Sequence, residues 1–433
     1  MPGGRWPIIF SELGQIARLV IIRGIGVGAT FLMSVLIVRK FGAETNGLFQ
    51  VGLSYAMIGA AVARLGQEQL ALRRVAGFRA NEDRVNARTL VRTALAMAIP
   101  MGVIVAVCMN LAAWITDDAG GMIFAFAFAV VPLAGLWILT EALRGWQYVS
   151  TAIFWQSTIP PALFVVIFAL LNALQVLSTQ FLPWVFVFCA TFALFGASIF
   201  WKSIVSLSAD DRANLRIKQF RSALKQGRDF WVLAIFTHVA AWIDILILMH
   251  FADAYVVGVF QPIVRTGGLI AVAINIATAG LVARLALLYY TSDTFNFARL
   301  VRLYWLMIGL GSISTGLVFL IFANEILAVW GPELLPYRDE LVSYVCIQVF
   351  QSIFIIAPLV GPVIGLERPM IVVQIVNLPL KVISVSAGYA YGDLLGVIVG
   401  LGFCTLFSVS WITALFLREL SKKGISLRLL VFG

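Results

Sequence analysis

The sequence predicts an all-α protein that crosses a membrane about twelve times, with its helices arranged in two six-helix lobes. Of its 433 residues, 61% are hydrophobic and only 12% are charged, and the mean hydropathy is +0.98. Soluble domains carry about 25% charged residues, and their surface helices keep a polar face. Long windows of this chain have no polar face, so a large soluble core does not explain the composition.

Apolar segments long enough to cross a bilayer follow one another along the chain. A membrane-spanning helix needs about 20 mainly apolar residues. Helices are predicted at 12–39, 46–66, 91–113, 121–144, 150–172, 181–202, 229–250, 254–284, 299–323, 340–366, 370–391 and 393–417. The last two are separated at Tyr391, Gly392 and Asp393, which predict a tight turn. The segment 324–339, with Pro332 and Pro336, is predicted to be a capping loop.

Lysine and arginine gather in alternate connections between these helices. One such connection contains Arg64, Arg73, Arg74, Arg79, Arg84, Arg88 and Arg92, and the middle one contains Lys202, Arg212, Arg216, Lys218, Arg221, Lys225 and Arg228. The opposite connections are mainly acidic, so the positive-inside rule places the basic ones and both termini in the cytoplasm. The net charge of +10 thus indicates membrane orientation and not nucleic-acid binding.

The segment 203–228 is the longest polar stretch and divides the chain into similar halves. We therefore predict an N-terminal six-helix lobe over 1–202, a basic cytoplasmic linker over 203–228, and a C-terminal lobe with a short cytoplasmic tail over 229–433. Six crossings return the chain to its starting side, so the halves are expected to be parallel repeats.

Basic residues inside predicted spans are the main functional candidates, because a charge in the bilayer core costs several kcal/mol unless it faces a cavity or a partner. Arg23, Arg265 and Lys381 each lie about eleven residues from one end of their helix, or roughly 16 Å along it; Arg18 is nearer the cytoplasmic side. Three cations at one depth predict a central cavity that binds an anion, and arginine can bond two phosphate oxygens at once. Asp244 is a candidate charge partner for Arg23 or Arg265; such pairing is the alternative to an anion site.

Three other polar residues receive structural interpretations. Glu141 and Arg144 are three residues apart and predict a surface ion pair. His238 is six residues from Asp244, a spacing that does not place both on one helix face, so a metal or proton-relay pair is not predicted.

The sequence contains no signature of catalysis or of cofactor binding. It has no phosphate-binding loop, no metal-spaced histidine cluster and no nucleophile with a nearby base. We predict no enzyme activity, no cofactor and no metal. With no ATP-binding domain, any transport is expected to use an ion gradient or the gradient of the substrate.

Three segments resemble known membrane proteins. Residues 38–49, VRKFGAETNGLF, resemble the loop after the first helix of polysaccharide flippases. Residues 253–265 resemble the start of their eighth helix, and Gly365-Leu366-Glu367-Arg368 resembles the turn between their tenth and eleventh helices. With the two lobes, the chain is similar to the O-antigen and capsule flippase branch of the multidrug/oligosaccharidyl-lipid/polysaccharide (MOP) exporter superfamily.

This resemblance implies that the chain flips an undecaprenyl-diphosphate-linked oligosaccharide across the bacterial inner membrane by alternating access. Arg23 and Arg265 are the counterparts of arginines that bind the diphosphate in lipid II flippases. Arg18 and Lys381 are further candidate diphosphate-binding residues from their positions inside the predicted spans. The implied partners are the lipid-linked glycan, membrane lipid and other polysaccharide-assembly proteins, in polysaccharide or lipopolysaccharide biosynthesis.

Other functions remain open at this stage. A cation-coupled multidrug exporter of the same superfamily needs acidic residues in its cavity, whereas the first helix offers two arginines. A non-transporting membrane subunit of a polysaccharide secretion complex would leave the intramembrane arginines without a role. A membrane glycosyltransferase or polymerase needs a large outer loop or a nucleotide-sugar domain, and the sequence predicts neither.

Overall fold

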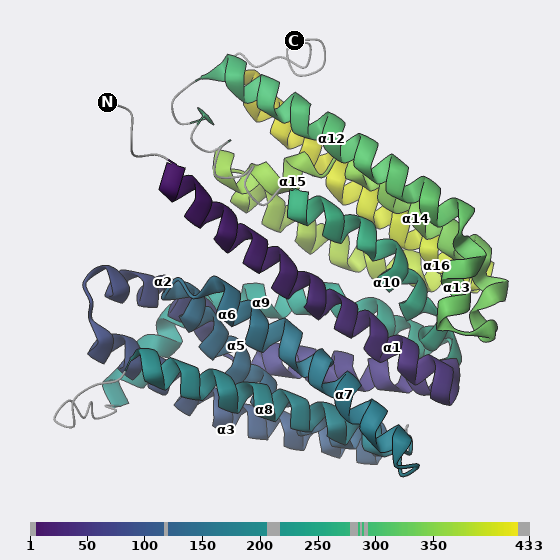
Figure 1. The fold of residues 1–433 in the computed structure, drawn as a ribbon, viewed down its shortest axis with the longest axis horizontal. Coiled ribbons are helices and arrows are strands. Elements are labelled where there is room, and N and C mark those ends of the chain that lie inside the picture. The colour runs from purple at the N-terminus through teal and green to yellow at the C-terminus, as the bar shows by residue number, and fades with distance from the viewer. Residues whose placement is uncertain are drawn as a thin grey trace. The chain divides into compact units, whose positions relative to one another are not determined.

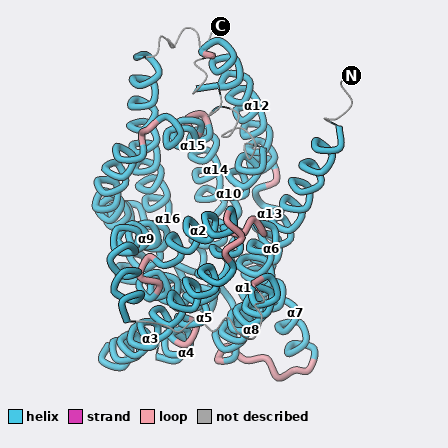
Figure 2. Tube along the Cα trace, turned by 90° about the vertical axis from the view of Figure 1, so that its left-hand side faces the viewer, coloured by secondary structure: helices cyan, strands magenta, loops and turns pink. Residues whose placement is uncertain are grey.

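The computed structural model describes residues 6–116, 120–205, 217–277, 285, 288–289 and 293–422. Within these ranges the secondary structure is helical and includes no strand, as Figure 2 shows. The chain folds as two compact units, Met1–Ile245 and Leu246–Gly433. The all-α membrane fold predicted from the sequence is confirmed.

The first unit is built from helices that follow the predicted spans closely (Figure 1). They are α1 (Trp6–Ala63), α2 (Gln67–Ala80), α3 (Arg84–Thr116), α4 (Gly120–Ala127), α5 (Val130–Gly145), α6 (Val149–Ile153), the π-helix η1 (Phe154–Thr158), α7 (Ile159–Ala173), α8 (Phe181–Ile204) and most of α9 (Ile217–Phe251). Gly42, at φ 86°, kinks α1 and separates its two spans.

The second unit contains the remaining helices. They are α10 (Ala254–Ala277), α12 (Thr294–Ile321), α13 (Ala323–Trp330), the 3-10 helix η2 (Pro332–Tyr337), α14 (Arg338–Ser352), α15 (Ile356–Val360), the 3-10 helix η3 (Gly361–Ile364) and α16 (Glu367–Lys422). The segment 324–339 is therefore mostly helical, in contrast to the predicted loop.

Nine helices in the described residues are long and apolar enough to cross a membrane. Two of them, α1 and α16, each combine two predicted spans across a kink, the second at Gly392 and Asp393. The predicted tenth span, 340–366, is not one helix, because it is interrupted at 353–355 between α14 and α15. With this broken segment, the count agrees with about twelve crossings.

Helix α5 forms the centre of the first unit and contacts α1, α2, α3 and α8. Its apolar residues are buried on every side, as expected for a helix with no polar face. Nearby, the Phe49 ring packs edge-on against Phe126 at a centroid distance of 5.0 Å and against Phe164 at 5.8 Å. In the second unit α14 is central and contacts α10, α12 and α16.

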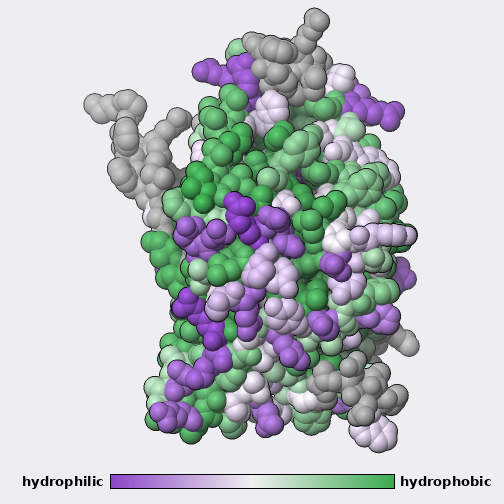
Figure 3. Space-filling model, turned by 90° about the vertical axis from the view of Figure 1, so that its right-hand side faces the viewer, coloured by the Kyte–Doolittle hydropathy of each residue, from purple (hydrophilic) through white to green (hydrophobic). Residues whose placement is uncertain are grey.

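Large apolar side chains also cover much of the outer surface, as the green areas of Figure 3 illustrate for one face. Leu310 and Ile321 of α12 are 67% and 69% exposed, and Phe195 of α8 is 66% exposed. Monomeric soluble proteins rarely expose apolar patches of such extent. Such a surface is typical of a helical bundle that is embedded in lipid.

The two spans of α16 pack glycine against glycine. A Cβ atom on Gly396 would lie 2.0 Å from the carbonyl oxygen of Gly388, and one on Gly400 would lie 2.4 Å from that of Ser384. Small residues allow membrane helices to approach this closely. The predicted turn at 391–393 is thus closed by backbone contact between the helices that it joins.

Replacing Gly396 by valine is expected to separate these two spans and to lower stability by about 1–3 kcal/mol, the usual cost of overpacking. Gly309 of α12 has no atom within 4 Å of its Cβ position, so Gly309→Val is the matched control and should be near neutral. Thermal unfolding of both variants in detergent measures the difference. Equal melting temperatures for the two would contradict the close contact.

Candidate functional site

The predicted cations of the first unit, Arg18 and Arg23, are both exposed on α1. Next to Arg23, the hydroxyl of Thr158 in η1 donates a hydrogen bond to the carbonyl oxygen of Ile22 over 3.0 Å. A Cβ atom on Gly26 would lie 2.8 Å from the carbonyl oxygen of Ser157. Helix α1 is therefore held against a π-turn, a feature often found at functional sites, and the guanidinium of Arg23 remains accessible.

The predicted cations of the second unit are half-buried. Arg265 lies on α10 beside Thr266, whose hydroxyl accepts a 3.0 Å hydrogen bond from the indole of Trp330. A Cβ atom on Gly267 would lie 2.4 Å from the ring of Tyr344 in α14, so the backbone around Arg265 is closely packed. Lys381 lies on the first span of α16.

Asp244, the predicted charge partner, is half-buried on α9. It lies in the first unit with Arg18 and Arg23, whereas Arg265 and Lys381 belong to the second unit. The roles of these five residues remain predictions.

A buried charged network in the first unit was not predicted from the sequence. Arg64 is 1% exposed and Glu68 is 3% exposed, although the sequence places Arg64 in a basic cytoplasmic connection. The Nε atom of Arg64 lies 3.7 Å from Oε1 of Glu68. This distance makes an ion pair, and both Arg64 Nε and Glu68 Oε2 are buried without a hydrogen-bond partner among the described residues. Burial raises the pKa of Glu68, and the charge of Arg64 opposes the rise.

The guanidinium of Arg64 also contacts aromatic rings of two other helices. It lies 4.5 Å from the ring centroid of Trp137 on α5, a cation–π distance. Its Nη2 atom is 3.1 Å from Nε2 of His238 on α9. Since a guanidinium only donates, Nε2 accepts, and Nδ1 donates to the carbonyl oxygen of Ala234 over 2.9 Å. This pattern requires a neutral His238, and a proton on Nε2 would place two cations side by side.

Two glycines bring α9 against the turn that carries Arg64. Gly66 has φ 71°, and a Cβ atom on it would lie 2.2 Å from the carbonyl oxygen of Gly227. The indole of Trp231 donates a 2.9 Å hydrogen bond to the carbonyl oxygen of Val62, and Gln67 donates one of 3.2 Å to that of Ala223. The start of α9 is thus fixed to the 62–67 turn by backbone contact and by hydrogen bonds.

The predicted surface ion pair of Glu141 and Arg144 is present, but it is not on the surface. Glu141 is 4% exposed, because α5 is the central helix of its unit. Arg144 is half-exposed; it contacts Glu141 and also Gln156 of η1. The helix spacing identified the pair correctly, and only the packing of α5 determined its burial.

No protein-family model matches this chain, and no curated protein sequence matches it. Solved structures match the chain over 94% of its length. An inward-facing multidrug resistance MATE family transporter of the MOP superfamily aligns with a TM-score of 0.70 at 14% identity, over 99% of that chain. A MATE transporter in complex with MaL6 aligns with a TM-score of 0.64 at 15% identity, over 96% of its chain.

A third structure is a MOP superfamily transporter from Pyrococcus furiosus, for which reverse polarity of the binding pocket is said to suggest a different function. It aligns with a TM-score of 0.63 at 15% identity, over 94% of this chain and 96% of the other. At these identities the likeness concerns the fold. The chain therefore has the fold of MATE transporters of the MOP superfamily.

Proposed function

We propose that this protein is a transporter that moves an undecaprenyl-diphosphate-linked oligosaccharide across the bacterial inner membrane by alternating access, with both termini in the cytoplasm. The observation that supports an anionic substrate is the charge of α1. Arg18 and Arg23 are exposed on a membrane helix that has no acidic residue between Arg18 and Phe41. A diphosphate supplies the negative charge that such arginines bind best.

The fold supports transport in general. Solved structures with this fold are described as transporters, and one of them is described as having a binding pocket of reverse polarity. Polyprenyl substrates are consistent with the apolar outer surface, because their chains can stay in lipid while the diphosphate is bound.

A multidrug exporter is the second candidate, and the comparisons favour it. The most extensive of the structural alignments given above is with a multidrug resistance MATE transporter. Organic cations would require carboxylates; α9 offers Asp244 for this purpose, whereas Glu141 is buried and paired with Arg144. The two candidates therefore differ in the sign of the charge that the protein must bind.

Depletion of the protein is expected to leave lipid-linked glycan on the cytoplasmic leaflet. Wild type should clear it, whereas Arg23→Ala and Arg265→Ala should each slow clearance roughly tenfold, about the effect of one lost charge-assisted hydrogen bond. Lys40→Ala, which removes an exposed cation from the outer end of the same α1 span, is the control and should behave as wild type. The measurement is the leaflet distribution of lipid-linked glycan at matched membrane levels of each variant.

The drug-export candidate is tested in the same strains by efflux of a fluorescent organic cation. If glycan never accumulates and cation efflux depends on Asp244, the anionic-substrate proposal is wrong and the multidrug function replaces it. If glycan accumulates and efflux is unchanged by Asp244→Asn, the flippase function stands.

A further inference from the structure

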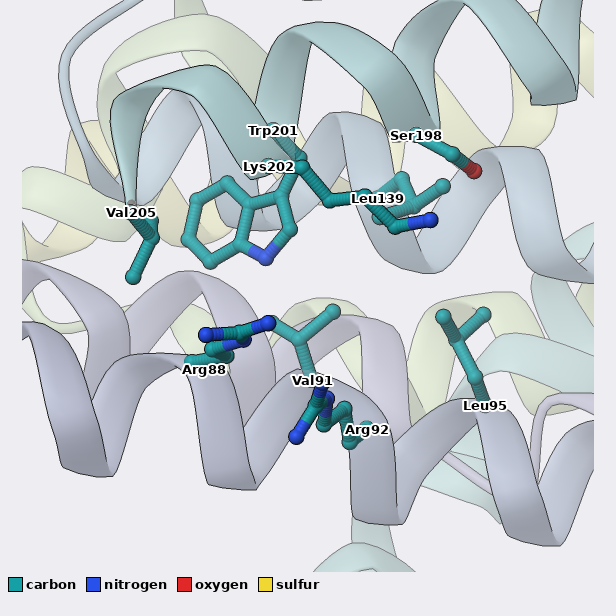
Figure 4. Close-up of a pocket in the computed structure, with 9 residues that line it drawn as sticks. All are labelled: Arg88, Val91, Arg92, Leu95, Leu139, Ser198, Trp201, Lys202 and Val205. Atoms are coloured by element: carbon teal, nitrogen blue, oxygen red, sulfur yellow. The ribbon is translucent and has the colours of Figure 1, made fainter. Parts of the chain in front are cut away.

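A cationic pocket of about 220 Å³ lies within the first unit, and its lining includes neither the candidate substrate-binding residues nor the Arg64 network. One wall is the start of α3, with Arg88 and Arg92, and the other is the end of α8, with Trp201 and Lys202. Figure 4 shows these two rows facing each other, with Leu139 of α5 behind them. Leu139 and Trp201 are 1% and 4% exposed, so the floor is apolar and only the rim is charged.

The three cations have no protein counter-charge in the part of the chain that the structure describes. None of Arg88, Arg92 and Lys202 makes a hydrogen bond or an ion pair with another described residue, and no acidic residue lines the pocket. Arg88 and Arg92 are four residues apart on one helix, a spacing at which like charges repel. An anion between the two walls would relieve this repulsion.

We expect the pocket to lie near the lipid headgroups. Arg92 is eight residues from the start of α3 at Arg84, about 12 Å along the helix. Trp201 packs against Trp146 with ring centroids 6.2 Å apart, and tryptophan is enriched near membrane interfaces. The positive-inside distribution predicts that this is the cytoplasmic side.

Apolar surface continues from the pocket into the membrane-spanning parts of the same two helices. On α8, Ile199 and Phe195 are 53% and 66% exposed, and on α3, Ile99 is 45% exposed. These residues lie one to two turns beyond the cations. A charged end followed by an apolar strip has the chemistry of one phospholipid, with its phosphate at the rim and its acyl chains along α3 and α8.

We propose that this pocket binds an anionic glycerophospholipid of the cytoplasmic leaflet, with Arg88, Arg92 and Lys202 holding its phosphate. The site is independent of the transported substrate and of the residues assigned to it. Bound lipid would hold α3 and α8 together over α5, at the end of the unit where the basic connections lie.

The test compares lipid binding by wild type and by the triple variant Arg88→Gln/Arg92→Gln/Lys202→Gln. Native mass spectrometry of the full chain, with phosphatidylglycerol or phosphatidylcholine added, counts the bound lipids. Each basic residue near an anionic lipid contributes about a factor of five, so the triple variant should bind phosphatidylglycerol on the order of a hundredfold more weakly. The control Arg74→Gln/Arg84→Gln/Arg299→Gln removes the same charge from exposed positions outside the pocket and should bind as wild type.

A second measurement locates the lipid. Phosphatidylglycerol with brominated chains should quench tryptophan fluorescence in wild type more than in Trp201→Phe, and brominated phosphatidylcholine should not distinguish them. The proposal is wrong if the triple variant keeps its phosphatidylglycerol, or if both lipids bind equally. It is also wrong if inorganic phosphate or a polyprenyl phosphate displaces phosphatidylglycerol at equal concentration, since the site would then belong to a free anion or to the transported lipid.

Discussion

Replacing Arg64 by methionine is expected to lower the free energy of unfolding by about 3–5 kcal/mol, because it leaves the buried carboxylate of Glu68 without its cation. The change also removes the donor to Nε2 of His238 and the cation over Trp137. Methionine keeps most of the side-chain volume, so the loss measures charge and hydrogen bonding more than a cavity. Thermal or denaturant unfolding of the purified protein in detergent provides the measurement.

The control is the double variant Arg64→Met/Glu68→Gln, which removes both charges. It should be more stable than Arg64→Met alone, because no uncompensated charge remains buried. A double variant no more stable than Arg64→Met would show that the ion pair contributes little, and that the other contacts of Arg64 account for the loss.

The ion pair of Arg64 and Glu68 also makes the free energy of unfolding depend on pH. Burial raises the pKa of Glu68 above its ordinary 4.5, and in Arg64→Met the opposing positive charge is gone, so the rise is larger. When the pKa of an acid is higher in the folded than in the unfolded protein, the protein loses stability as the pH rises from the unfolded-state pKa to the folded-state pKa. The stability gap between wild type and Arg64→Met should therefore narrow as the pH falls toward 4.5. Unfolding measured over this range checks the sign.

Replacing Gly66 by alanine is expected to detach the start of α9 from the 62–67 turn, with a cost of about 2–4 kcal/mol from overpacking and from the left-handed backbone. The added Cβ would lie 2.2 Å from one backbone atom, the carbonyl oxygen of Gly227, and 2.6 Å from another, the amide nitrogen of Trp231. Neither is the flexible end of a side chain. Trypsin cleavage at Arg228, together with melting temperature, should report the loosened helix.

Gly77 of α2 supplies the matched control for this substitution. It has no atom within 4 Å of its Cβ position and lies in a helix interior, where alanine is favoured over glycine by about 0.5–1 kcal/mol. Gly77→Ala should thus be neutral or stabilising. A Gly66→Ala protein as stable as Gly77→Ala would contradict the backbone contact.

Sequence reasoning recovered most of the membrane-spanning helices because the bilayer dictates the length and hydrophobicity of each span. The turn at 391–393 was found from Gly392 and Asp393, which the structure confirms as the kink of α16. The tenth span was predicted as one helix, since 340–366 is mainly apolar. Pro358 was the available signal for the interruption at 353–355, because a proline inside a helix clashes with the carbonyl group four residues before it, here that of Phe354.

The buried network around Arg64 could not be predicted from the sequence for a different reason. Arg64, Glu68 and His238 come from positions up to 174 residues apart, and a basic connection predicts a solvated arginine. Gly66 and Gly227 were the available signals, because glycine is needed at positive φ and at close backbone approach. Neither glycine indicates which helix approaches it.

The sequence by itself determined that this chain is an all-helical membrane protein with charges in its spans, because transfer to lipid is decided residue by residue. Only the tertiary structure decided which charges are buried together. Arg64 is shielded from water because α5 and α9 pack against the turn that carries it, and Glu141 because α5 lies at the centre of its unit. Arg88, Arg92 and Lys202 line one pocket because α3 and α8 both pack on α5. Such proximity depends on helix packing, which local sequence patterns do not encode.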